Sequence, residues 1–290
     1  MPRSQKPTFT TPRKQQPPVV LSFGALDPAG GGGVQADIET AASLACHCAP
    51  IATALCTKGG PDLTVTLAID STLLIEQARS VLEDMAVAAI KIGFTGSVAN
   101  VEALHSILRD YPHIPVVLHP ALHLWDQDKA EQSGLLGALS ELLLPQATVT
   151  HMNLAELRQM APEADTLDAS AQAIINRGCD YLLVYGSEQQ NRRLQNSLYR
   201  SQGLVKHYQR AHIASNCHSS ASTLASSVAA YLGHNCHPLS AIEQGQDYTW
   251  QTLIAARQLG SGKAIPHRFF WADQSASAPG QQPPAVKSMH

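Results

Sequence analysis

A run of four glycines at residues 30–33 is the feature that most constrains what this chain can fold into. It follows an apolar, strand-like segment at residues 19–23 and leads into a stretch with helical spacing. This order predicts a turn at the carboxyl end of a strand, where open α/β sheets bind their ligands. Glycines also leave backbone N–H groups accessible to a small molecule or a phosphate and permit positive φ angles. A tight turn without any ligand would look the same in sequence.

The glycine run does not match two common nucleotide-binding motifs. No Lys-Ser or Lys-Thr pair follows it, as a GxxxxGK[ST] loop requires, and its spacing fits the dinucleotide fingerprint poorly. Along the rest of the chain, short apolar runs alternate with segments of helical spacing. The runs lie at residues 116–118, 148–150 and 181–184, and the helical segments at residues 73–85, 98–108, 134–144 and 169–177. This alternation predicts a three-layer α/β/α fold with a mostly parallel central sheet.

Composition agrees with a single α/β domain. The chain has 290 residues, of which 44% are hydrophobic and 15% charged, so it can bury a large core. A net charge of -3 and a pI near 6.5 leave no electrostatic footprint for a nucleic-acid partner. The sequence shows no apolar run of membrane-spanning length and no apolar signal-peptide core. We therefore expect a cytoplasmic protein without a membrane partner.

The six cysteines are expected to be reduced thiols, because no secretory signal accompanies them. The segments Cys46-His47-Cys48, Cys217-His218 and Cys236-His237 contain the ligand types of zinc. However, Cys46 and Cys48 are one residue apart, which fits the usual Cys-x-x-Cys pair poorly. Ordinary packing is the favoured interpretation of these residues, and a structural metal is the alternative.

Two terminal segments are predicted to lie outside the domain, which then spans residues 19–271. Residues 1–18 are basic and rich in proline, and residues 272–290 are rich in Ser, Gln, Ala and Pro. Neither segment can bury enough apolar surface to order itself, so both are predicted to be disordered. The basic arm could contact an anionic partner, but a solvated tail is the favoured interpretation.

Several motifs together resemble one enzyme family. Asp27-Pro28 before the glycine run and Gln35-Ala36-Asp37 after it resemble the opening of the hydroxymethylpyrimidine and phosphomethylpyrimidine kinases of thiamin biosynthesis, members of the ribokinase-like superfamily. The resemblance extends over residues 19–271. It continues through Ile90-Lys91-Ile92-Gly93, Thr150-His151-Met152-Asn153-Leu154-Ala155-Glu156, residues 223–232 and residues 259–263. It implies a ribokinase-like fold and an ATP-dependent kinase that uses Mg²⁺. The implied substrate is 4-amino-5-hydroxymethyl-2-methylpyrimidine or its monophosphate, and the implied assembly is a homodimer.

The resemblance also implies roles for individual residues. Positions that bind the substrate in the family fall on Ala25, Asp27, Gly32, Lys58 and Phe94. Positions that organise Mg²⁺ and phosphate fall on Asn153 and Glu156, the ATP phosphate-binding turn on Ser219, Ser220 and Ala221, and the catalytic base on Ser222. Structural uses of the same residue types are the alternatives. Asn-x-x-Glu is also a helix capping box, Asp27 before a proline also forms an Asx turn, and Lys91 could be a surface lysine.

The chain departs from the family pattern at four places. Where the family has Gly-Thr-Gly-Cys, this chain has Ser219-Ser220-Ala221-Ser222, so both glycines are lost and a hydroxyl that accepts protons poorly replaces the base. Lys58 replaces a glutamine, His119 an acidic residue, and Tyr185 a lysine. Two other functions therefore stay open. One is a catalytically silent relative that binds a pyrimidine, a vitamin-like ligand or a nucleotide, and the other is a kinase of a pyridoxal-like substrate.

Overall fold

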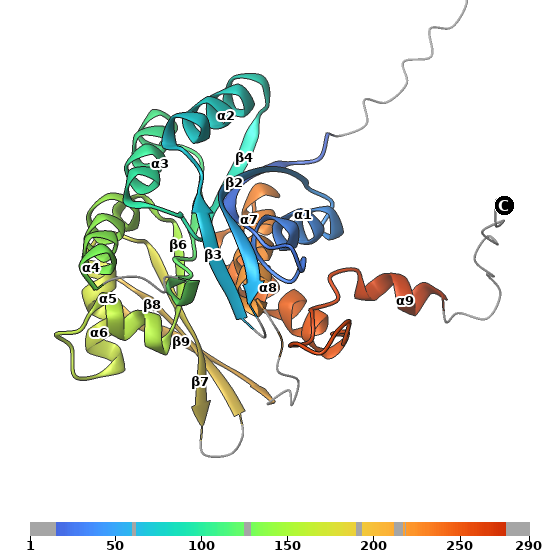
Figure 1. Cartoon of the computed structure of the whole chain (residues 1–290). Helices are drawn as coiled ribbons and strands as arrows, with labels where there is room; N and C mark the ends of the chain where they lie inside the picture. The colour runs from blue at the N-terminus through green and yellow to red at the C-terminus, as the bar shows by residue number, and fades with distance from the viewer. Residues whose placement is uncertain are drawn as a thin grey trace, which may run out of the picture.

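The computed structural model describes residues 16–59, 62–124, 129–189, 193–211, 217 and 219–276. Its centre is a nine-stranded sheet in the order β3-β2-β1-β4-β5-β6-β7-β8-β9 (Figure 1). The strands are β1 (Val19–Leu26), β2 (His47–Gly59), β3 (Asp62–Ala68), β4 (Val87–Ile92), β5 (Val116–Leu118), β6 (Val149–Asn153), β7 (Tyr181–Gln189), β8 (Arg193–Arg200) and β9 (Gly203–Ala211). The six strands from β2 to β7 in this order run parallel. The predicted mostly parallel sheet is therefore confirmed.

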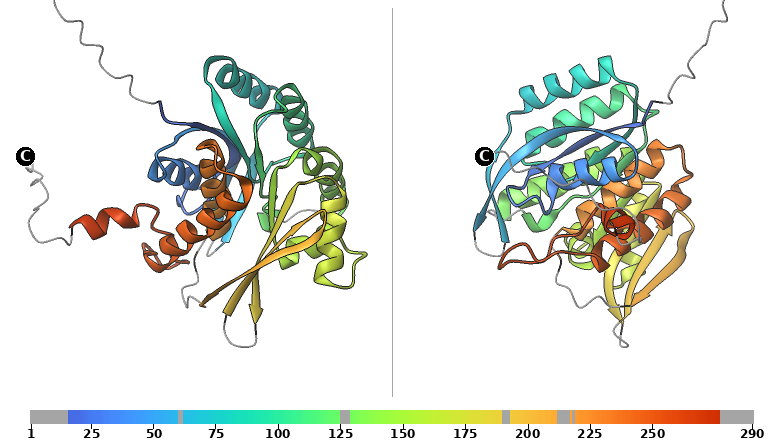
Figure 2. Two further views of the ribbon diagram at one scale, coloured as in Figure 1. Left: turned by 180° about the vertical axis from the view of Figure 1, so that it is seen from behind. Right: turned by 90° about the vertical axis from the view of Figure 1, so that its right-hand side faces the viewer.

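Helices cover both faces of the sheet. They are α1 (Gly33–Ser43), α2 (Ser71–Asp84), α3 (Val98–Asp110), α4 (Lys129–Ala138), α5 (Leu154–Met160), α6 (Leu167–Asn176), α7 (Ser220–Gly233), α8 (Pro238–Ile254) and α9 (Phe270–Ala276). Figures 1 and 2 show α2 to α6 along one face, and α1, α7 and α8 along the other. This is the expected three-layer arrangement.

Each face of the sheet has its own hydrophobic core, because successive strand residues point to opposite sides. In β1, Leu21 and Phe23 pack with the core beneath α2 to α6, whereas Val20 packs with the core beneath α7 and α8. All three side chains are at most 2% exposed. Burial on both faces explains why the strand sequences read as continuous apolar runs.

Antiparallel strands extend the sheet at both edges, which the sequence did not predict. β3 pairs antiparallel with β2, and β8 and β9 continue antiparallel from β7. All residues of β9 are exposed or half-buried, so no continuous apolar run marks it. The predicted helix at residues 134–144 also differs in detail. It divides into α4, a π-helical turn at Leu139–Leu143 and a 3-10 turn at Leu144–Gln146.

A buried carboxylate joins four elements beneath the carboxyl edge of the sheet. Asp37 of α1 accepts hydrogen bonds from Ser22 Oγ of β1 (2.5 Å), Lys91 Nζ of β4 (2.8 Å) and Ser226 Oγ of α7. Asp37 and Lys91 are each 1% exposed. Lys91 is therefore not a surface lysine, which corrects that alternative. A buried ion pair is tolerated when hydrogen bonds satisfy its remaining polar atoms, as the two serines do here.

The ends of the described chain lie close to the predicted domain limits. Pro18 is already docked, because its carbonyl accepts a hydrogen bond from His47 N (2.8 Å). At the other end, α9 crosses the proposed boundary at residue 271. The remaining predicted tail residues, 1–15 and 277–290, lie outside the described residues. Within the described part, no helix is both long and apolar enough to cross a membrane.

Candidate functional site

A small cavity lies between the glycine run and the first turn of α7, at the carboxyl ends of β1, β4 and β5. We call it the glycine-loop cavity, and its volume is about 40 Å³. The sequence-predicted site residues that line it are Ala25, Asp27, Phe94, Ser219, Ala221 and Ser222. Lys91 and His119 line it as well. The structure therefore brings residues from widely separated segments to the predicted sheet edge, whereas Lys58 lies in β2 and its side chain lies outside the described part.

Asp27 organises the glycine loop. Its Oδ1 accepts a hydrogen bond from Ala29 N (2.8 Å), and its Oδ2 accepts one from Gly32 N (2.8 Å). Gly33 follows at φ +58, where an added Cβ would overlap the carbonyl oxygen of Ala25, so only glycine fits there. The Asx turn that the sequence offered as an alternative is therefore formed. The same Asp27 lines the cavity, so the turn does not exclude a binding role.

The first turn of α7 faces the glycine loop at very short range. Ser219 is the N-cap of α7 and has φ 58 and ψ 36, in the left-handed region. Loss of the family glycine therefore has not removed the positive φ angle, which a serine adopts at a cost of about 1–2 kcal/mol. A Cβ added to Gly32 would lie 2.8 Å from Ser219 Cβ and closer still to its Oγ. Gly32 is thus the partner that leaves room for Ser219.

The N-terminus of α7 is suited to an anion. The first backbone N–H groups of a helix have no intrahelical acceptor, and the helix dipole adds positive potential at the same end. No side-chain cap bond is present at Ser219. Ala221 and Ser222 line the cavity immediately after this end, so a phosphate placed there would meet helix N–H groups.

Three aromatic rings form a column beside the cavity. The rings of His119 and His151 stack with centroids 4.5 Å apart, and Tyr185 lies 5.4 Å from His151. Burial lowers the pKa of His151 to about 3 and that of His119 well below 6.5, with Lys91 lowering both further. Burial likewise raises the pKa of Tyr185 well above 10. A neutral column therefore stands where the resembled family has an acidic residue and a lysine.

Asn153 and Glu156 form the capping box of α5. Asn153 Oδ1 accepts a hydrogen bond from Glu156 N (2.8 Å), and Glu156 Oε2 accepts one from Asn153 N (2.9 Å). Glu156 Oε1 accepts a further bond from Leu122 N (3.1 Å). Both carboxylate oxygens therefore bind backbone N–H groups, and neither residue lines the glycine-loop cavity in the described structure.

These residues do not fit a protein-only magnesium site. Within the described ranges, no group of three His, Cys, Asp or Glu side chains is placed to hold a metal ion. The oxygens of Asn153 and Glu156 that the resemblance assigns to Mg²⁺ are occupied by the capping box. Mg²⁺ commonly keeps several waters and is held largely by substrate phosphates. Any Mg²⁺ here would therefore enter with a nucleotide. The six cysteines, all in the described part, form no disulfide, as expected for reduced thiols.

A second pocket opens on the other side of the α7 turn, between α7, α8 and the strands β7 to β9. We call it the hairpin pocket, and its volume is about 220 Å³. Ser220 and Ala221 line it, and Ala221 also lines the glycine-loop cavity. Its walls include Leu224 and Trp250, and the Arg210 guanidinium lies 6.0 Å from the Trp250 ring. The two spaces therefore both border the N-terminus of α7.

Apart from Tyr185, Ser220 and Ala221, the residues of the hairpin pocket were not singled out from sequence. Trp250 lies in α8 and Arg210 in the edge strand β9, and only the folded sheet brings them together. Aromatic and apolar residues at helical spacing ordinarily indicate core, so no local signal distinguished Trp250. Asn196, which donates to Gln246 Oε1 (2.8 Å), lay in an equally featureless segment.

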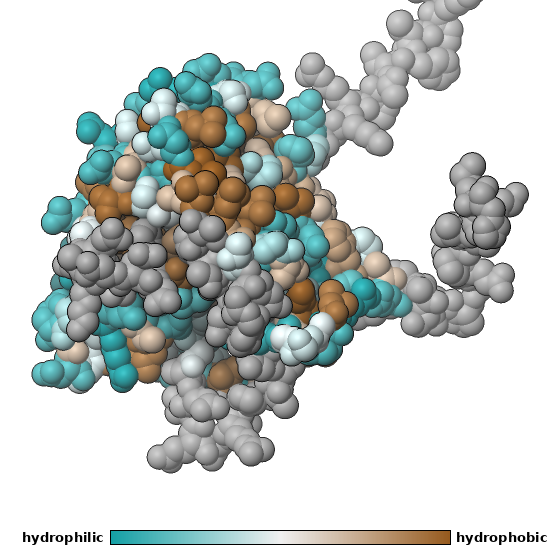
Figure 3. All heavy atoms as spheres, in the orientation of Figure 1, coloured by the Kyte–Doolittle hydropathy of each residue, from teal (hydrophilic) through white to brown (hydrophobic). Residues whose placement is uncertain are grey.

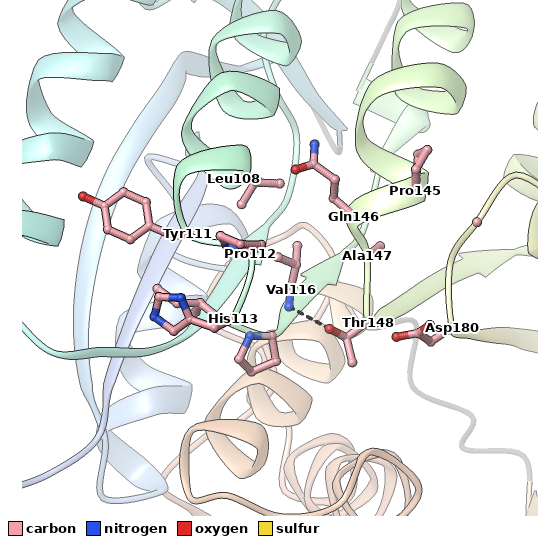
Figure 4. Close-up of a pocket in the computed structure, with 13 residues that line it drawn as sticks. Leu108, Tyr111, Pro112, His113, Val116, Pro145, Gln146, Ala147, Thr148 and Asp180 are labelled. Atoms are coloured by element: carbon pink, nitrogen blue, oxygen red, sulfur yellow. Dashed lines mark hydrogen bonds between the residues drawn. The ribbon is translucent and has the colours of Figure 1, made fainter.

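A larger cavity, of about 390 Å³, lies at the opposite edge of the sheet. Figure 4 shows its lining near the start of β5, where Val116 N donates a hydrogen bond to Thr148 Oγ1 (3.1 Å). Its ionisable side chains His113 and Asp180 are exposed, and it contains none of the predicted site residues. It is therefore a surface cleft at the amino ends of the strands, away from the edge where ligands are expected.

The neutral histidine column makes the fold sensitive to acid. The folded-state pKa of His151 is about 3 and that of His119 lies well below 6.5, while both are ordinary in the unfolded chain. The stability that they contribute is therefore complete above pH 6.5 and is lost as the pH falls from 6.5 toward 3. Urea unfolding between pH 7.5 and 5 should show this loss. His151→Phe should flatten the slope by up to about 1.4 kcal/mol per pH unit, and a slope equal to that of the exposed-site control His113→Asn would contradict the prediction.

The contact between Gly32 and Ser219 can be tested by a double-mutant cycle. Gly32→Ala should cost about 1–3 kcal/mol of unfolding free energy, because the new methyl meets Ser219 while its backbone, at φ -135, accepts alanine. Ser219→Gly should stabilise the fold by about 0.5–1 kcal/mol by relieving the left-handed strain. The double variant should recover most of the loss, as measured by urea unfolding. Gly260→Ala, which meets no atom within 4 Å, is the control. Simple additivity of the two changes would show that these residues do not meet.

Comparison with known proteins agrees with this geometry. A family model described as phosphomethylpyrimidine kinase matches residues 27–267. The hydroxymethylpyrimidine/phosphomethylpyrimidine kinase of Rhizobium meliloti (strain 1021) is 27% identical over 264 residues, covering 88% of this chain and 99% of the relative. The enzyme of the same name from Escherichia coli (strain K12) is 24% identical over 250 residues, covering 84% of this chain and 94% of the relative.

Solved structures share the fold. The pyridoxal kinase of Bacillus subtilis, in an ADP complex, superimposes with a TM-score of 0.80 at 20% identity, covering 88% of this chain and 98% of that one. The phosphomethylpyrimidine kinase of Clostridium difficile 630 superimposes with a TM-score of 0.67 at 18% identity, covering 81% and 98%. The predicted ribokinase-like α/β/α fold is confirmed. Because the family model extends from Asp27 to His267, the chain belongs to the phosphomethylpyrimidine kinase family.

Proposed function

We propose that this chain transfers a phosphoryl group from ATP, supplied as its Mg²⁺ complex, to 4-amino-5-hydroxymethyl-2-methylpyrimidine or its monophosphate. The observation that carries the proposal is that the glycine-loop cavity and the hairpin pocket both border Ala221. Phosphoryl transfer needs a donor and an acceptor in line across one anion-binding point. The N-terminus of α7 supplies that point. Family membership selects the pyrimidine as acceptor.

The hairpin pocket suits the nucleotide. Its lining is mainly apolar around Leu224, Trp250 and Leu253, which favours a heteroaromatic base, and Arg210 offers a cation beside it. Solved pyridoxal kinases of Staphylococcus aureus with the same fold contain ADP or AMP-PCP. The phosphates would extend from this pocket toward Ser220 and Ala221, where helix N–H groups stabilise their charge.

The glycine-loop cavity suits the acceptor but must widen to admit it. A volume of about 40 Å³ holds a few water molecules and not a pyrimidine ring. The side chain of His123 lines the cavity and is 57% exposed, with Nδ1 3.7 Å from Glu156 Oε1, and we take it as the part of the wall that moves outward. Phe94 offers an aromatic face to the ring. Lys91 contributes positive charge from below, fixed in place by Asp37.

The hydroxyl proton needs an acceptor other than a family cysteine. Ser222 is 8% exposed and lines the cavity, but a serine hydroxyl is a poor base near pH 7. His119 lines the same cavity with a neutral imidazole, but burial holds its pKa well below 6.5, so it is a weak proton acceptor. Because phosphoryl transfer depends mainly on positioning and electrostatics, a weak base slows the reaction without excluding it.

A ligand-binding role without turnover is the second candidate function. The specific observation in its favour is that the turn which replaces Gly-Thr-Gly-Cys holds a strained Ser219 and no strong base. A kinase of a pyridoxal-like substrate is the third, supported by the structural likeness to pyridoxal kinases.

A coupled ATP-consumption assay distinguishes these functions. With the hydroxymethylpyrimidine, its monophosphate and pyridoxal as acceptors, we expect slow turnover of a pyrimidine by the wild type. Restoring the family turn by Ser219→Gly, Ser220→Thr, Ala221→Gly and Ser222→Cys should raise the rate, because a lost general base costs on the order of a hundredfold to ten-thousandfold. Ser222→Ala is the matched control and should stay at or below the wild-type rate.

The outcomes separate the candidates. Turnover of a pyrimidine that rises in the restored variant supports the proposal. Calorimetric binding of the pyrimidine without turnover in either protein would favour the silent relative, and turnover of pyridoxal alone would favour the third function. Rapid wild-type turnover would contradict the claim that the turn is impaired.

The homodimer and the cytoplasmic location remain predictions. Leu26, Leu55 and Leu67 lie in register on neighbouring strands β1, β2 and β3, and each is at least 37% exposed. Figure 3 shows apolar residues gathered on this side of the molecule, around β2, β3 and α2. Such a row of exposed leucines supports burial against a second copy of the chain.

A further inference from the structure

Arg268 is a buried cation that no motif singled out. It follows α8 in sequence, its side chain is 0% exposed, and it is the largest fully buried residue in the described structure. A guanidinium removed from water is costly unless hydrogen bonds satisfy its donors. The groups that accept its hydrogen bonds therefore indicate what Arg268 does in the fold.

The guanidinium joins the glycine loop to the first turn of α7, the two segments between which the glycine-loop cavity lies. On the loop side, Nη2 donates to the carbonyl oxygen of Gly31 (2.5 Å) and Nη1 to that of Gly30 (3.4 Å). On the helix side, Nε donates to Thr223 Oγ1 (3.1 Å) in the first turn of α7. Nη1 also pairs with Glu39 Oε2 of α1 (2.9 Å). The planar, forked guanidinium fixes these groups relative to one another in a way that a lysine cannot.

The Arg268 hydrogen bonds lie next to the close contact between the glycine loop and the first turn of α7. Gly32, the next residue after the clamped carbonyls, lies against Ser219, and Thr223 N donates back to Ser219 O (3.4 Å). Arg268 is itself anchored, because its carbonyl oxygen accepts hydrogen bonds from Ser43 Oγ (2.6 Å) and Tyr248 Oη (2.8 Å). The segment after α8 is thereby fixed behind the glycine loop.

We propose that Arg268 is a positioning residue of the acceptor site, which holds the glycine loop at a set distance from the first turn of α7. This role rests on the proposed function, because it takes the glycine-loop cavity as the place of the pyrimidine. Arg268 lines neither cavity in the described structure, and the two carbonyl oxygens that it holds belong to the glycine loop, which does not border the hairpin pocket. Its loss should therefore affect the acceptor and spare the nucleotide.

Two measurements on the full-length chain test this role in Arg268→Lys. Calorimetry should show that the dissociation constant for the hydroxymethylpyrimidine rises by about tenfold or more, since hydrogen bonds from a charged group are lost, while that for AMP-PCP changes by less than about twofold. Hydrogen–deuterium exchange should become faster in peptides that cover residues 29–33 and stay unchanged in β5 and β6. Arg257→Lys, which changes an exposed arginine, is the control and should keep the wild-type affinities.

Each outcome decides the proposal. Equal weakening of both ligands would make Arg268 a general stabiliser and overturn it, as would unchanged pyrimidine affinity. Should Arg268→Lys fail to fold, Thr223→Val removes only the helix-side acceptor and should show a smaller split in the same direction. If Thr223→Val changes the dissociation constants of the pyrimidine and of AMP-PCP equally, or changes neither, the positioning role of Arg268 is overturned. Should the wild type bind no pyrimidine, the proposed function fails. The exchange rates of residues 29–33 then decide the positioning role alone, with faster exchange supporting it and unchanged exchange refuting it.

Discussion

The buried carboxylate of Asp37 is the interaction on which the rest of the structure depends. It accepts hydrogen bonds from β1, β4 and α7 while it belongs to α1, the helix that the glycine loop begins. Because its partner Lys91 is equally buried, removing either one would leave an uncompensated charge in the core, which typically costs about 3–5 kcal/mol. The glycine loop and α7 are therefore fixed to the same point of the sheet. The geometry of both cavities follows from this attachment.

Above this point, the resemblance to the family implies that the chain keeps the framework of the site and changes its charges. The glycine loop keeps its Asx turn, and Ser219 keeps a left-handed backbone without the glycine that would adopt it freely. His119 and Tyr185 stand in place of an acidic residue and a lysine, and with His151 they form a neutral column. The changes at His119 and Tyr185 are complementary, because either an acidic residue or a lysine alone in this buried position would lack its counter-charge. We therefore infer that the site still positions its ligands but stabilises their charge less strongly than the resembled family does.

The sequence predicted the parts of this arrangement that have local physical signals. Apolar runs and glycine placement located β1, β5 and the loop before α1, because burial on both faces and positive φ angles each leave a mark in sequence. Family motifs singled out Asp27, Phe94 and Ser222, which line one cavity in the structure, although their binding and catalytic roles stay predictions. They did not separate a capping box from a metal site at Asn153, since both use the same residues. Arg268 and Trp250 had no signal, because their partners are distant in sequence and only the packed helices bring them together.

In the proposed reaction, the nucleotide donor and the pyrimidine acceptor bind at the same time, on either side of the α7 turn. Calorimetric titration of the hydroxymethylpyrimidine into protein saturated with AMP-PCP and Mg²⁺ tests this claim most directly. We expect one pyrimidine to bind per chain, with an affinity equal to or higher than its affinity for the nucleotide-free protein. Loss of pyrimidine binding in the presence of AMP-PCP would show that the two ligands compete for one space, and it would contradict the account.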